Sequence, residues 1–407
     1  MAPPPPGRGP PRTRPHLGCA GWRARRRGSR GALGCRSRSQ DYETATAYRG
    51  HPRAAHPTHQ EVTVSRTPTP TEPSTPAGRD GTGRRRVGFV INPIKFDDLR
   101  AVREEADTVC HILGWDAPLW RETTEEDPGA GQARELLEAG CDLVVPIGGD
   151  GTVRTVASQL VGTEVPLGLV PGGTGNLLVR NLDLPFLSRR QALRIALTGD
   201  ERRIDVGQVR WWDTDGGVHE DVFLVMAGVG MDADVMETTD DDVKKRMGWL
   251  AYLASAVRHG GDKPVPARFR VDDSEPVSAK VRSVVFGNVG KLQGGVAVLP
   301  EARIDDGQLD TFVVSPRGVT GWAGVVAAVA TRGRLGGENA GYWQSSTIDV
   351  ELGEPTRAQL DGDGIGHVTR IAGRILPGAL IVRVRGKGAT SWRSTRSDHA
   401  EGWLLGG

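Results

Sequence analysis

The stretch DLVVPIGGDGTVRTVASQLV, Asp142–Val161, decides the fold class of this 407-residue chain. Asp142–Ile147 is an apolar run of strand length, and Val153–Val161 carries apolar residues at helical spacing. Between them lie glycines, Asp150 and Thr152, without the GK[ST] of a P-loop or the dinucleotide GxGxxG spacing. The stretch therefore predicts a strand, a glycine-rich turn that lets the backbone approach a phosphate, and a helix.

A second unit of the same kind follows at VPLGLVPGGTGNLLVRNL, Val165–Leu182. Its predicted strand, VPLGLV, runs into Pro171–Asn176 and then into a helical stretch. In a parallel sheet both turns lie at the carboxyl edge, where ligands bind between strand ends and helix N-termini. The side chains of Thr152, Thr174 and Asn176 add hydrogen-bonding groups that suit phosphate oxygens. Together the two turns predict one phosphate site.

Asp150 needs a separate explanation, because a carboxylate repels an anionic phosphate. Its presence is reasonable if Mg²⁺ or a basic group lies between the two anions. It is equally reasonable if Asp150 accepts a proton from an incoming hydroxyl group. The residues alone leave both roles open.

The segments before these turns show the same alternation of strand and helix. Val87–Ile91 is a short apolar run closed by Asn92 and Pro93, as expected for a buried parallel strand. A helix is predicted over residues 97–115, a strand over residues 117–124 and a helix over residues 129–140. This order implies a parallel sheet with right-handed crossovers and helices on both faces.

After about Arg203 the chain consists mainly of short β-rich segments separated by Gly, Asp and Pro, among them RIDVGQVRWW and HEDVFLVMAGVG. This pattern is typical of an antiparallel sandwich or barrel. Helical stretches at Asp242–His259 and Gly318–Thr331 interrupt it. The predicted fold class is therefore α/β plus β: a parallel-sheet α/β domain over residues 85–203, an antiparallel β-sandwich domain over residues 204–388, and a tail over residues 389–407.

Residues 1–84 are rich in Pro, Arg, Gly, Ser and Thr, which predicts a disordered extension. A targeting segment or an overextended start are the alternatives. Residues 1–86 hold 17 Arg against 5 Asp or Glu, so the formal charge of +2 for the whole chain leaves −10 for the remainder. We therefore expect no basic nucleic-acid surface on the folded part.

The four cysteines form no CxxC pair, which argues against a zinc site or a disulfide framework and fits a reducing compartment. No apolar run approaches the ~20 residues that span a bilayer. We therefore expect a cytoplasmic protein without a transmembrane segment, at most peripherally associated with a membrane. The sequence does not fix the oligomeric state, and a homodimer is one option.

A series of motifs resembles the diacylglycerol kinase catalytic family, which also includes sphingosine, ceramide and bacterial lipid kinases. The resemblance covers Val87–Arg385, roughly three-quarters of the chain, and keeps the family's motif order. GGDGT alone is shared with NAD kinases, but the later motifs are specific to lipid kinases. The motifs are GGDGT at 148–152, PGGTGNLLVRNL at 171–182, GVGMDADV at 228–235, GNVGKLQGGVAVLPEARIDDGQLD at 287–310 and QLDGDG at 359–364.

The resemblance implies that the α/β domain binds the phosphates of ATP and that the β-sandwich domain receives the lipid acceptor. Where the family has Asn-Pro-x-Ser-Gly, this chain has NPIKF, which adds the charge of Lys95. A nucleotide-contacting threonine of the family matches Thr123, with Thr124 as the alternative. The implied nucleotide-binding residues are Asn92, Pro93, Lys95, Thr123, Gly148, Gly149, Asp150, Gly151, Thr152, Gly173, Thr174 and Asn176.

The family's late Asp-Gly-Glu motif corresponds here to Asp361, Gly362 and Asp363. The resemblance implies that Asp363 is the general base that takes the proton from the lipid hydroxyl, although family members usually have the longer Glu. Asp361 is implied to help hold Mg²⁺ or to orient the nucleotide. Asp150 is the competing base, since some relatives give that role to the GGDGT aspartate.

The loop ARIDDGQLD resembles a family loop that binds a structural Mg²⁺ ion. Asp306 is implied to supply its carboxylate, and Arg303 and Gln308 their backbone carbonyls; hard oxygen ligands suit this ion. Asp232, in GVGMDADV, is implied to line the acceptor cleft.

The expected function is ATP- and Mg²⁺-dependent phosphorylation of a lipid hydroxyl at a membrane surface, with diacylglycerol as the family's default acceptor. Sphingoid bases, ceramide, phosphatidylglycerol and isoprenoid-type alcohols are further acceptors to consider. An NAD kinase shares GGDGT and the architecture, but its downstream Asn-Glu element is not apparent. A third hypothesis is a non-catalytic nucleotide- or lipid-binding protein of the same fold, because NPIKF and the Asp in place of the family's Glu depart from the family's motifs.

Overall fold

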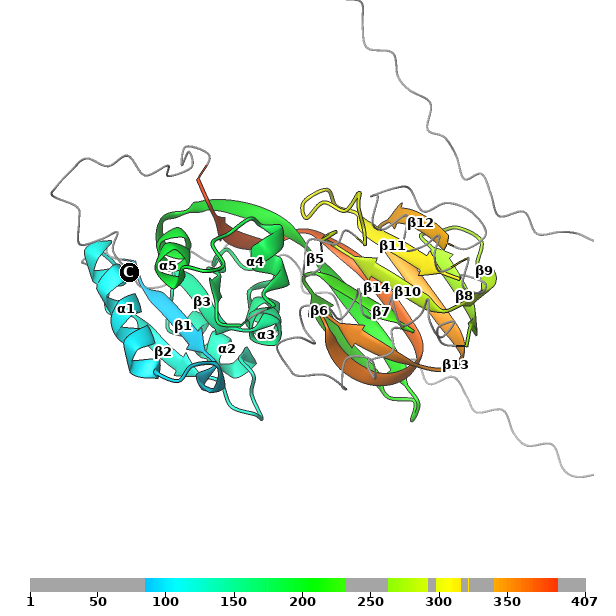
Figure 1. Cartoon of the computed structure of the whole chain (residues 1–407), viewed down its shortest axis with the longest axis horizontal. Helices are drawn as coiled ribbons and strands as arrows, with labels where there is room; N and C mark the ends of the chain where they lie inside the picture. Colours follow the sequence, from blue (N-terminus) through cyan, green and yellow to red (C-terminus); the bar gives the residue numbers. More distant parts are fainter. Residues whose placement is uncertain are drawn as a thin grey trace, which may run out of the picture. The chain divides into compact units, whose positions relative to one another are not determined.

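The computed structural model describes residues 85–173, 175–230, 263–291, 298–315, 321 and 340–386. All of them belong to one compact unit, Pro76–Gly407. Parallel strands paired edge to edge form the first part of this unit, and antiparallel strands form the second (Figure 1). The predicted fold class is thereby confirmed.

The first part contains a four-stranded parallel sheet of order β2-β1-β3-β4. Its strands are β1 Val87–Ile91, β2 Leu119–Glu122, β3 Leu143–Gly148 and β4 Val170–Pro171. The helices of this part are the 3-10 turn η1 Pro93–Lys95 and the α-helices α1 Leu99–Ile112, α2 Ala130–Glu138, α3 Asp150–Leu160, α4 Leu177–Asn181 and α5 Arg189–Thr198.

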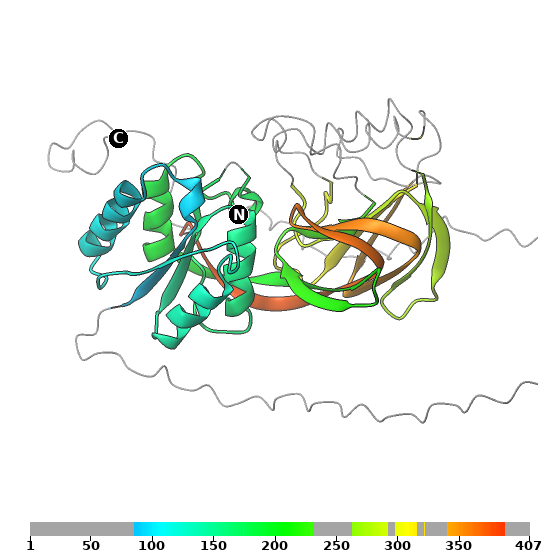
Figure 2. The ribbon, with the colours of Figure 1, turned by 90° about the horizontal axis from the view of Figure 1, so that it is seen from below.

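Helices cover both faces of this sheet (Figure 1 and Figure 2). Phe89 packs in one buried cluster with residues of α1 and α5, whereas its neighbour Val90 packs in another with residues of α2 and α3. Successive side chains of a strand point to opposite faces, so a strand buried on both faces reads as a continuous apolar run. This explains why all five residues of β1 are buried.

Two helices and one strand differ from the expectation. The helix after β3 begins at Asp150 and not at Val153, because Gly149 is its N-cap. The strand expected over VPLGLV is reduced to Val170–Pro171, while Leu167 makes single parallel bridges to Val144 and to Val382. Helix α5 was not expected; Ser188 begins it by accepting a hydrogen bond from the N–H of Gln191.

The second part is built of antiparallel strands in the order β12-β11-β10-β7-β13-β14-β5-β6, with β8 and β9 attached through β13. The strands are β5 Asp200–Asp213, β6 Val218–Phe223, β7 Met226–Val229, β8 Val265–Val271, β9 Val277–Val281, β10 Ser283–Gly287, β11 Leu309–Val314, β12 Ala340–Ser345, β13 Thr347–Leu360 and β14 Asp363–Val384.

Strand β13 makes the corner of the sandwich. Its first residues pair with β8 and its last residues with β7, with a register shift between Glu351 and Thr356. A bulge of this kind lets one strand change its neighbours and bend between layers. Strand β14 then pairs with β5 from Val368 to Val384, and the bridge from Val382 to Leu167 ties its end to the α/β sheet.

Several expectations concern residues outside the described ranges. Asp242–His259 and Asp232 are among them, as are Thr174 and, apart from position 321, Gly318–Thr331. The proposed domain bounds, including the extension over residues 1–84, stay predictions. Within the described residues, no helix is long and apolar enough to cross a membrane.

Candidate active site

The first glycine turn leads from β3 directly into α3. Gly149 is the N-cap of α3 with φ −85° and ψ −175°, and no side chain caps this helix end. A Cβ built at Gly149 meets no heavy atom within 4 Å, so the space above this residue is open. The first backbone N–H groups of a helix have no intrahelical partner and attract anions. The geometry therefore suits a phosphate group at Gly149.

The second glycine turn lies directly beside the first. The N–H of Gly172 donates to the carbonyl of Gly148 over 3.0 Å. A Cβ at Gly172 would stand 2.9 Å from Gly148 Cα, and one at Gly173 would stand 3.6 Å from Gly149 Cα. The adjacency expected from the parallel strand order is thus present in the structure.

Asn176 shapes the second turn from within. It is buried, has a left-handed backbone with φ 43°, and its Nδ2 donates to the carbonyl of Gly173 over 2.8 Å. Its Oδ1 atom is buried without a hydrogen-bond partner among the described residues. The Asn176 amide group therefore stabilises the turn through Nδ2, while its acceptor Oδ1 is unused among the described residues.

Asp150 connects the two turns. Its Oδ1 accepts a hydrogen bond of 2.7 Å from the N–H of Leu177, the first residue of α4. A Cβ at Gly175 would collide with Asp150 Oδ2, so residue 175 must lack a side chain for the aspartate to fit. These contacts support the organising role of Asp150 over the role of general base.

The loop after β1 reaches the first turn through Asn92. Its Oδ1 accepts the N–H of Ile94 over 3.1 Å, which caps η1, and its Nδ2 lies 3.5 Å from Thr152 Oγ1. Pro93 opens η1 and the side chain of Lys95 is exposed. Asn92 is thus placed beside the turn as expected.

Thr123 and Phe96 complete this side of the site. Thr123 is buried, and its N–H donates to the carbonyl of Ile91. The ring of Phe96 lies against Gly172, since a Cβ there would be 2.8 Å from the ring atom Cζ. The aromatic residue of NPIKF therefore packs against the second glycine turn.

Asp361 and Asp363 lie in contrasting environments although one residue separates them. Asp361 is 6% exposed, and its carboxylate accepts the N–H groups of Leu224, Val225 and Met226 over 2.9, 2.9 and 3.0 Å. Burial raises the pKa of Asp361 to about 6, while the three N–H donors act to lower it. These contacts fix the corner between β6 and β7 and support a structural role for Asp361; its catalytic role stays a prediction.

Asp363 instead faces the first glycine turn. Its side chain is 55% exposed, and its Oδ2 accepts a hydrogen bond of 3.0 Å from Arg154, 209 residues earlier in the chain. A Cβ at Gly151 would stand 3.1 Å from the same Oδ2 atom. The structure thus brings a carboxylate of the hairpin between β13 and β14 against the first turn of α3.

In the loop expected to bind a structural Mg²⁺ ion, backbone N–H groups donate hydrogen bonds to carboxylates. Asp306 Oδ1 accepts the N–H of Gln308 over 3.0 Å, and partial burial raises the pKa of Asp306. The buried Asp205 accepts the N–H groups of Gly307 and Gly378. Among the described residues no three His, Cys, Asp or Glu side chains cluster as a metal site. The expected ligands of the structural Mg²⁺ ion are the Asp306 carboxylate and the backbone carbonyls of Arg303 and Gln308, and this ligand set stays a prediction.

Comparison with known proteins identifies the family. The family model for the diacylglycerol kinase catalytic domain matches residues 98–209, and the model for the YegS C-terminal NAD kinase beta sandwich-like domain matches residues 225–384. A protein of Chromohalobacter salexigens named "Probable lipid kinase YegS-like" is 30% identical over 269 residues, which are 64% of this chain and 82% of the relative. The chain belongs to the diacylglycerol kinase and YegS-like lipid kinase family.

One further relative and one solved structure are similar to this chain. A diacylglycerol kinase of Mycobacterium tuberculosis is 34% identical over 190 residues, which are 44% of this chain and 59% of the relative. The chain thus spans less than two-thirds of that protein. The crystal structure of a diacylglycerol kinase from Bacillus anthracis str. Sterne aligns with a TM-score of 0.58 at 22% identity, over 75% of this chain and 98% of the other. At this identity the alignment shows a shared fold.

Two residues of the candidate site, Arg154 and Asp221, are not among those predicted from the sequence. Arg154 lies on α3, two positions after GGDGT, and Asp221 lies on β6. Arg154 forms ion pairs with Asp221 and with Asp363. The position of Arg154 next to GGDGT was the available signal. Nothing in the sequence linked Asp221 to it, because the contact forms only when β6 packs against α3.

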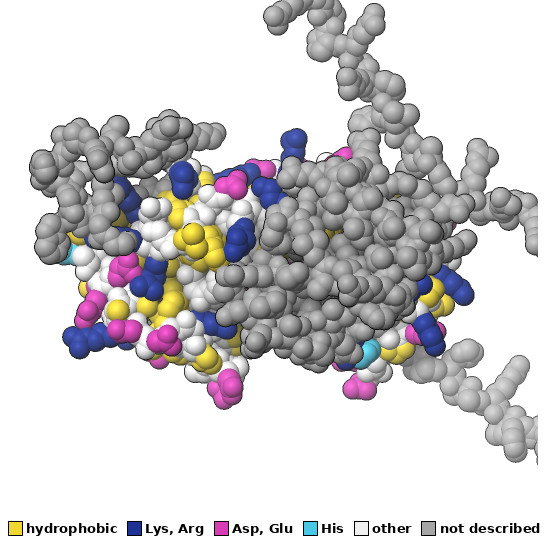
Figure 3. All heavy atoms as spheres, in the orientation of Figure 1, with side chains coloured by type: hydrophobic (Ala, Val, Ile, Leu, Met, Phe, Trp, Pro, Cys, Tyr) yellow, Lys and Arg dark blue, Asp and Glu magenta, His cyan; other side chains and the backbone are white. Residues whose placement is uncertain are grey.

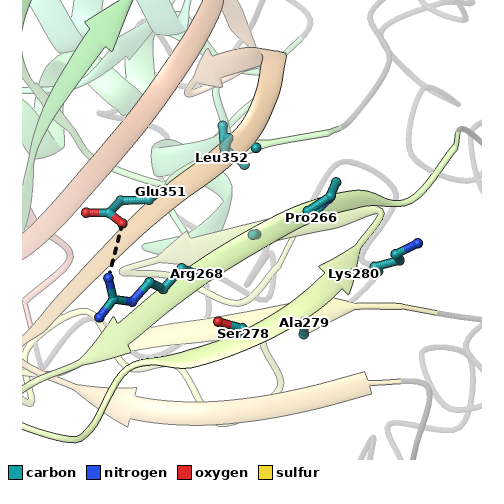
Figure 4. A pocket seen from close by; sticks show the side chains of 9 residues that line it. Pro266, Arg268, Ser278, Ala279, Lys280, Glu351 and Leu352 are labelled. Atoms are coloured by element: carbon teal, nitrogen blue, oxygen red, sulfur yellow. Dashed lines mark ion pairs between the residues drawn. The ribbon is translucent and has the colours of Figure 1, made fainter. Parts of the chain in front are cut away.

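A separate hollow of about 560 Å³ lies away from these turns, among β8, β9 and β13 (Figure 4). It is lined by residues such as Pro266, Ser278 and Leu352, and two further lining residues, Arg268 and Glu351, form an ion pair of 3.9 Å. No residue of the glycine turns lines it. Elsewhere, Lys and Arg alternate with Asp and Glu over the described part of one face (Figure 3).

Proposed function

We propose that this chain is an ATP- and Mg²⁺-dependent lipid kinase that transfers the γ-phosphoryl group to a lipid hydroxyl, with diacylglycerol as the expected acceptor and phosphatidic acid as the product. The observation that carries the proposal is the position of Asp363 against Gly151 in the GGDGT turn. A phosphate site and a carboxylate that faces it are the two parts that phosphoryl transfer to an alcohol requires.

In this proposal the two glycine turns bind the phosphates of ATP. The open space at Gly149 and the uncapped start of α3 receive anionic oxygens, and Asn92 and Thr152 supply polar groups nearby. Asp363 accepts the proton of the lipid hydroxyl as its oxygen attacks the γ-phosphorus atom, and ADP leaves. General bases in such positions contribute about 10²–10⁴-fold to the rate.

Mg²⁺ would supply charge neutralisation on the β- and γ-phosphates. Asp150 is the carboxylate at the two turns that would hold it near the nucleotide. Asp306, whose Oδ1 accepts one backbone N–H, would supply a carboxylate oxygen to the structural ion, and Arg303 and Gln308 would supply their backbone carbonyls. Both assignments rest on oxygen ligands, which this ion prefers.

The acceptor follows from the chemistry that the relatives' names indicate, since these include a diacylglycerol kinase and a YegS-like lipid kinase. The test is to incubate the full chain with γ-labelled ATP, Mg²⁺ and a cell lipid extract, and to identify labelled lipids by mass spectrometry. Phosphatidic acid is the expected product. Labelled NADP formed from added NAD would indicate the NAD kinase reading. ATP binding without transfer to any lipid would indicate the non-catalytic one.

Replacing Gly149 by Ala is expected to raise the KM for ATP at least ~10-fold, because the methyl group occupies the space of a phosphate oxygen. The fold should tolerate it, since φ and ψ suit Ala and the Cβ meets no atom. An N-cap Ala costs about 1 kcal/mol or less relative to Gly, or ~2–4 °C in melting temperature. Steady-state kinetics and thermal melts measure both effects.

Gly148→Ala provides the contrast, because its Cβ would lie 2.8 Å from Thr152 Cβ and should destabilise the fold. An unchanged KM for ATP in Gly149→Ala would mean that phosphate does not approach the first turn.

A further inference from the structure

Arg154 is placed between two carboxylates at the edge of the proposed site. It is the fifth residue of α3, and its side chain is 12% exposed. Its NH1 atom lies 3.4 Å from Asp221 Oδ2, and its NH2 atom lies 3.0 Å from Asp363 Oδ2. One guanidinium group therefore joins the helix after the GGDGT turn to two different strands.

The two carboxylates differ in how firmly they are held. Asp221 lies within β6, paired with Val209 of β5, and its Oδ1 accepts the N–H of Val222 over 2.7 Å. Asp363 is the first residue of β14, directly after the turn, and more than half of its side chain is exposed. Asp221 thus fixes the guanidinium, and the guanidinium in turn restrains Asp363.

Only one partner of this contact, Arg154, is shielded from solvent, whereas Asp363 is more than half exposed. Exposed pairs contribute little, because both side chains stay solvated and flexible. Arg154 is largely buried, and its Nε atom has no hydrogen-bond partner among the described residues. Burying a partly unsatisfied guanidinium is unfavourable for stability alone. Retaining it is reasonable if the contact with Asp363 serves the reaction.

The geometry also divides the two oxygens of Asp363. Oδ2 is bound by Arg154 and lies against Gly151, whereas Oδ1 makes no hydrogen bond within the described part of the chain. We propose that Arg154, held by Asp221, is a positioning residue that fixes Asp363 so that Oδ1 accepts the proton of the acceptor hydroxyl. This inference rests on the proposed function. A misplacement of about 1 Å costs ~10²-fold in rate when geometry is decisive.

The test compares Arg154→Met, Arg154→Lys and Asp221→Asn in the full chain, with Arg100→Met as the matched control. Arg100 pairs with Glu104 on the exposed side of α1, and its side chain is 87% exposed. Arg154→Met should lower kcat about 10²-fold and leave the KM for ATP within about 2-fold. Arg154→Lys should restore kcat to within about 10-fold of the wild type, Asp221→Asn should lower it about 10-fold, and the control should match the wild type.

Two results of these kinetics would overturn the inference. The first is an Arg154→Met variant with unchanged kcat and a raised KM for ATP, which would make Arg154 a phosphate ligand. The second concerns the double variant Arg154→Met/Asp363→Asn. If adding Arg154→Met to Asp363→Asn lowers kcat as much as it does in the wild type, the two residues act independently.

Crystal structures of the wild type and of Arg154→Met give a readout that needs no turnover. The inference predicts that the Asp363 carboxylate leaves Gly151 in the variant, and an unmoved carboxylate contradicts it. If the wild type phosphorylates no lipid, the proposed function fails, while these two structures still decide the positioning contact.

Discussion

The Asp363→Asn variant is expected to lose about 10³-fold in kcat for ATP-dependent lipid phosphorylation and to bind ATP as the wild type does. The amide cannot accept the proton of the lipid hydroxyl, but it fills the same space beside Gly151. Since the side chain is 55% exposed, its pairing with Arg154 adds at most about 1 kcal/mol to stability. Radiolabel transfer, ATP titration and thermal melting measure the three quantities.

Asp215→Asn is the matched control for this variant, because Asp215 is an exposed aspartate in the turn between β5 and β6. It should retain full activity. An Asp363→Asn variant within about 3-fold of the wild-type kcat would remove Asp363 as the base and return that role to Asp150.

The Asp361→Asn variant should show the opposite behaviour and lose stability. The carboxylate accepts three backbone N–H groups in a buried position, and an amide nitrogen in place of one oxygen would face a donor with another donor. Losing such charge-assisted hydrogen bonds costs about 3 kcal/mol, or roughly 6–12 °C in melting temperature. The measurement is a thermal or urea melt at pH 7.5, above the pKa of about 6 that burial gives this group.

Asp363→Asn is the control in the same melt. It makes the same chemical change two residues further along the chain, where the side chain is exposed. If both variants melt at the wild-type temperature, the three N–H contacts contribute nothing to the fold. If Asp361→Asn keeps its stability and loses kcat as Asp363→Asn does, Asp361 belongs to the reaction.

Much of the fold was predictable because it follows from local patterns. The apolar run of β1 and the glycine turns after β3 and β4 specify strands that are buried on both faces and end at one sheet edge. The adjacency of Gly148 and Gly172 follows from that strand order and is confirmed. Turn chemistry was less visible: Gly149 caps α3, so Asp150 and Thr152 belong to the helix and not to the loop before it.

The division of labour in Asp361-Gly362-Asp363 was not predictable. Both acids have the same chemistry and nearly the same sequence position, and the Asp-Gly pair by itself indicates a turn. Asp361 has φ 50° and turns inward to amides 135–137 residues earlier, whereas Asp363 turns outward to Arg154. Contacts of such range depend on how β6, β7 and α3 pack, which no local pattern encodes.

The measurement that tests the central claim most directly is transfer of the labelled γ-phosphate of ATP to diacylglycerol in mixed micelles, with Mg²⁺ and the wild-type chain in excess over ATP. The account predicts labelled phosphatidic acid in a single exponential phase that is about 10³-fold slower in Asp363→Asn. The account would be contradicted if ATP binds but the label stays in ATP or appears in inorganic phosphate, with none in diacylglycerol or in the other lipid alcohols.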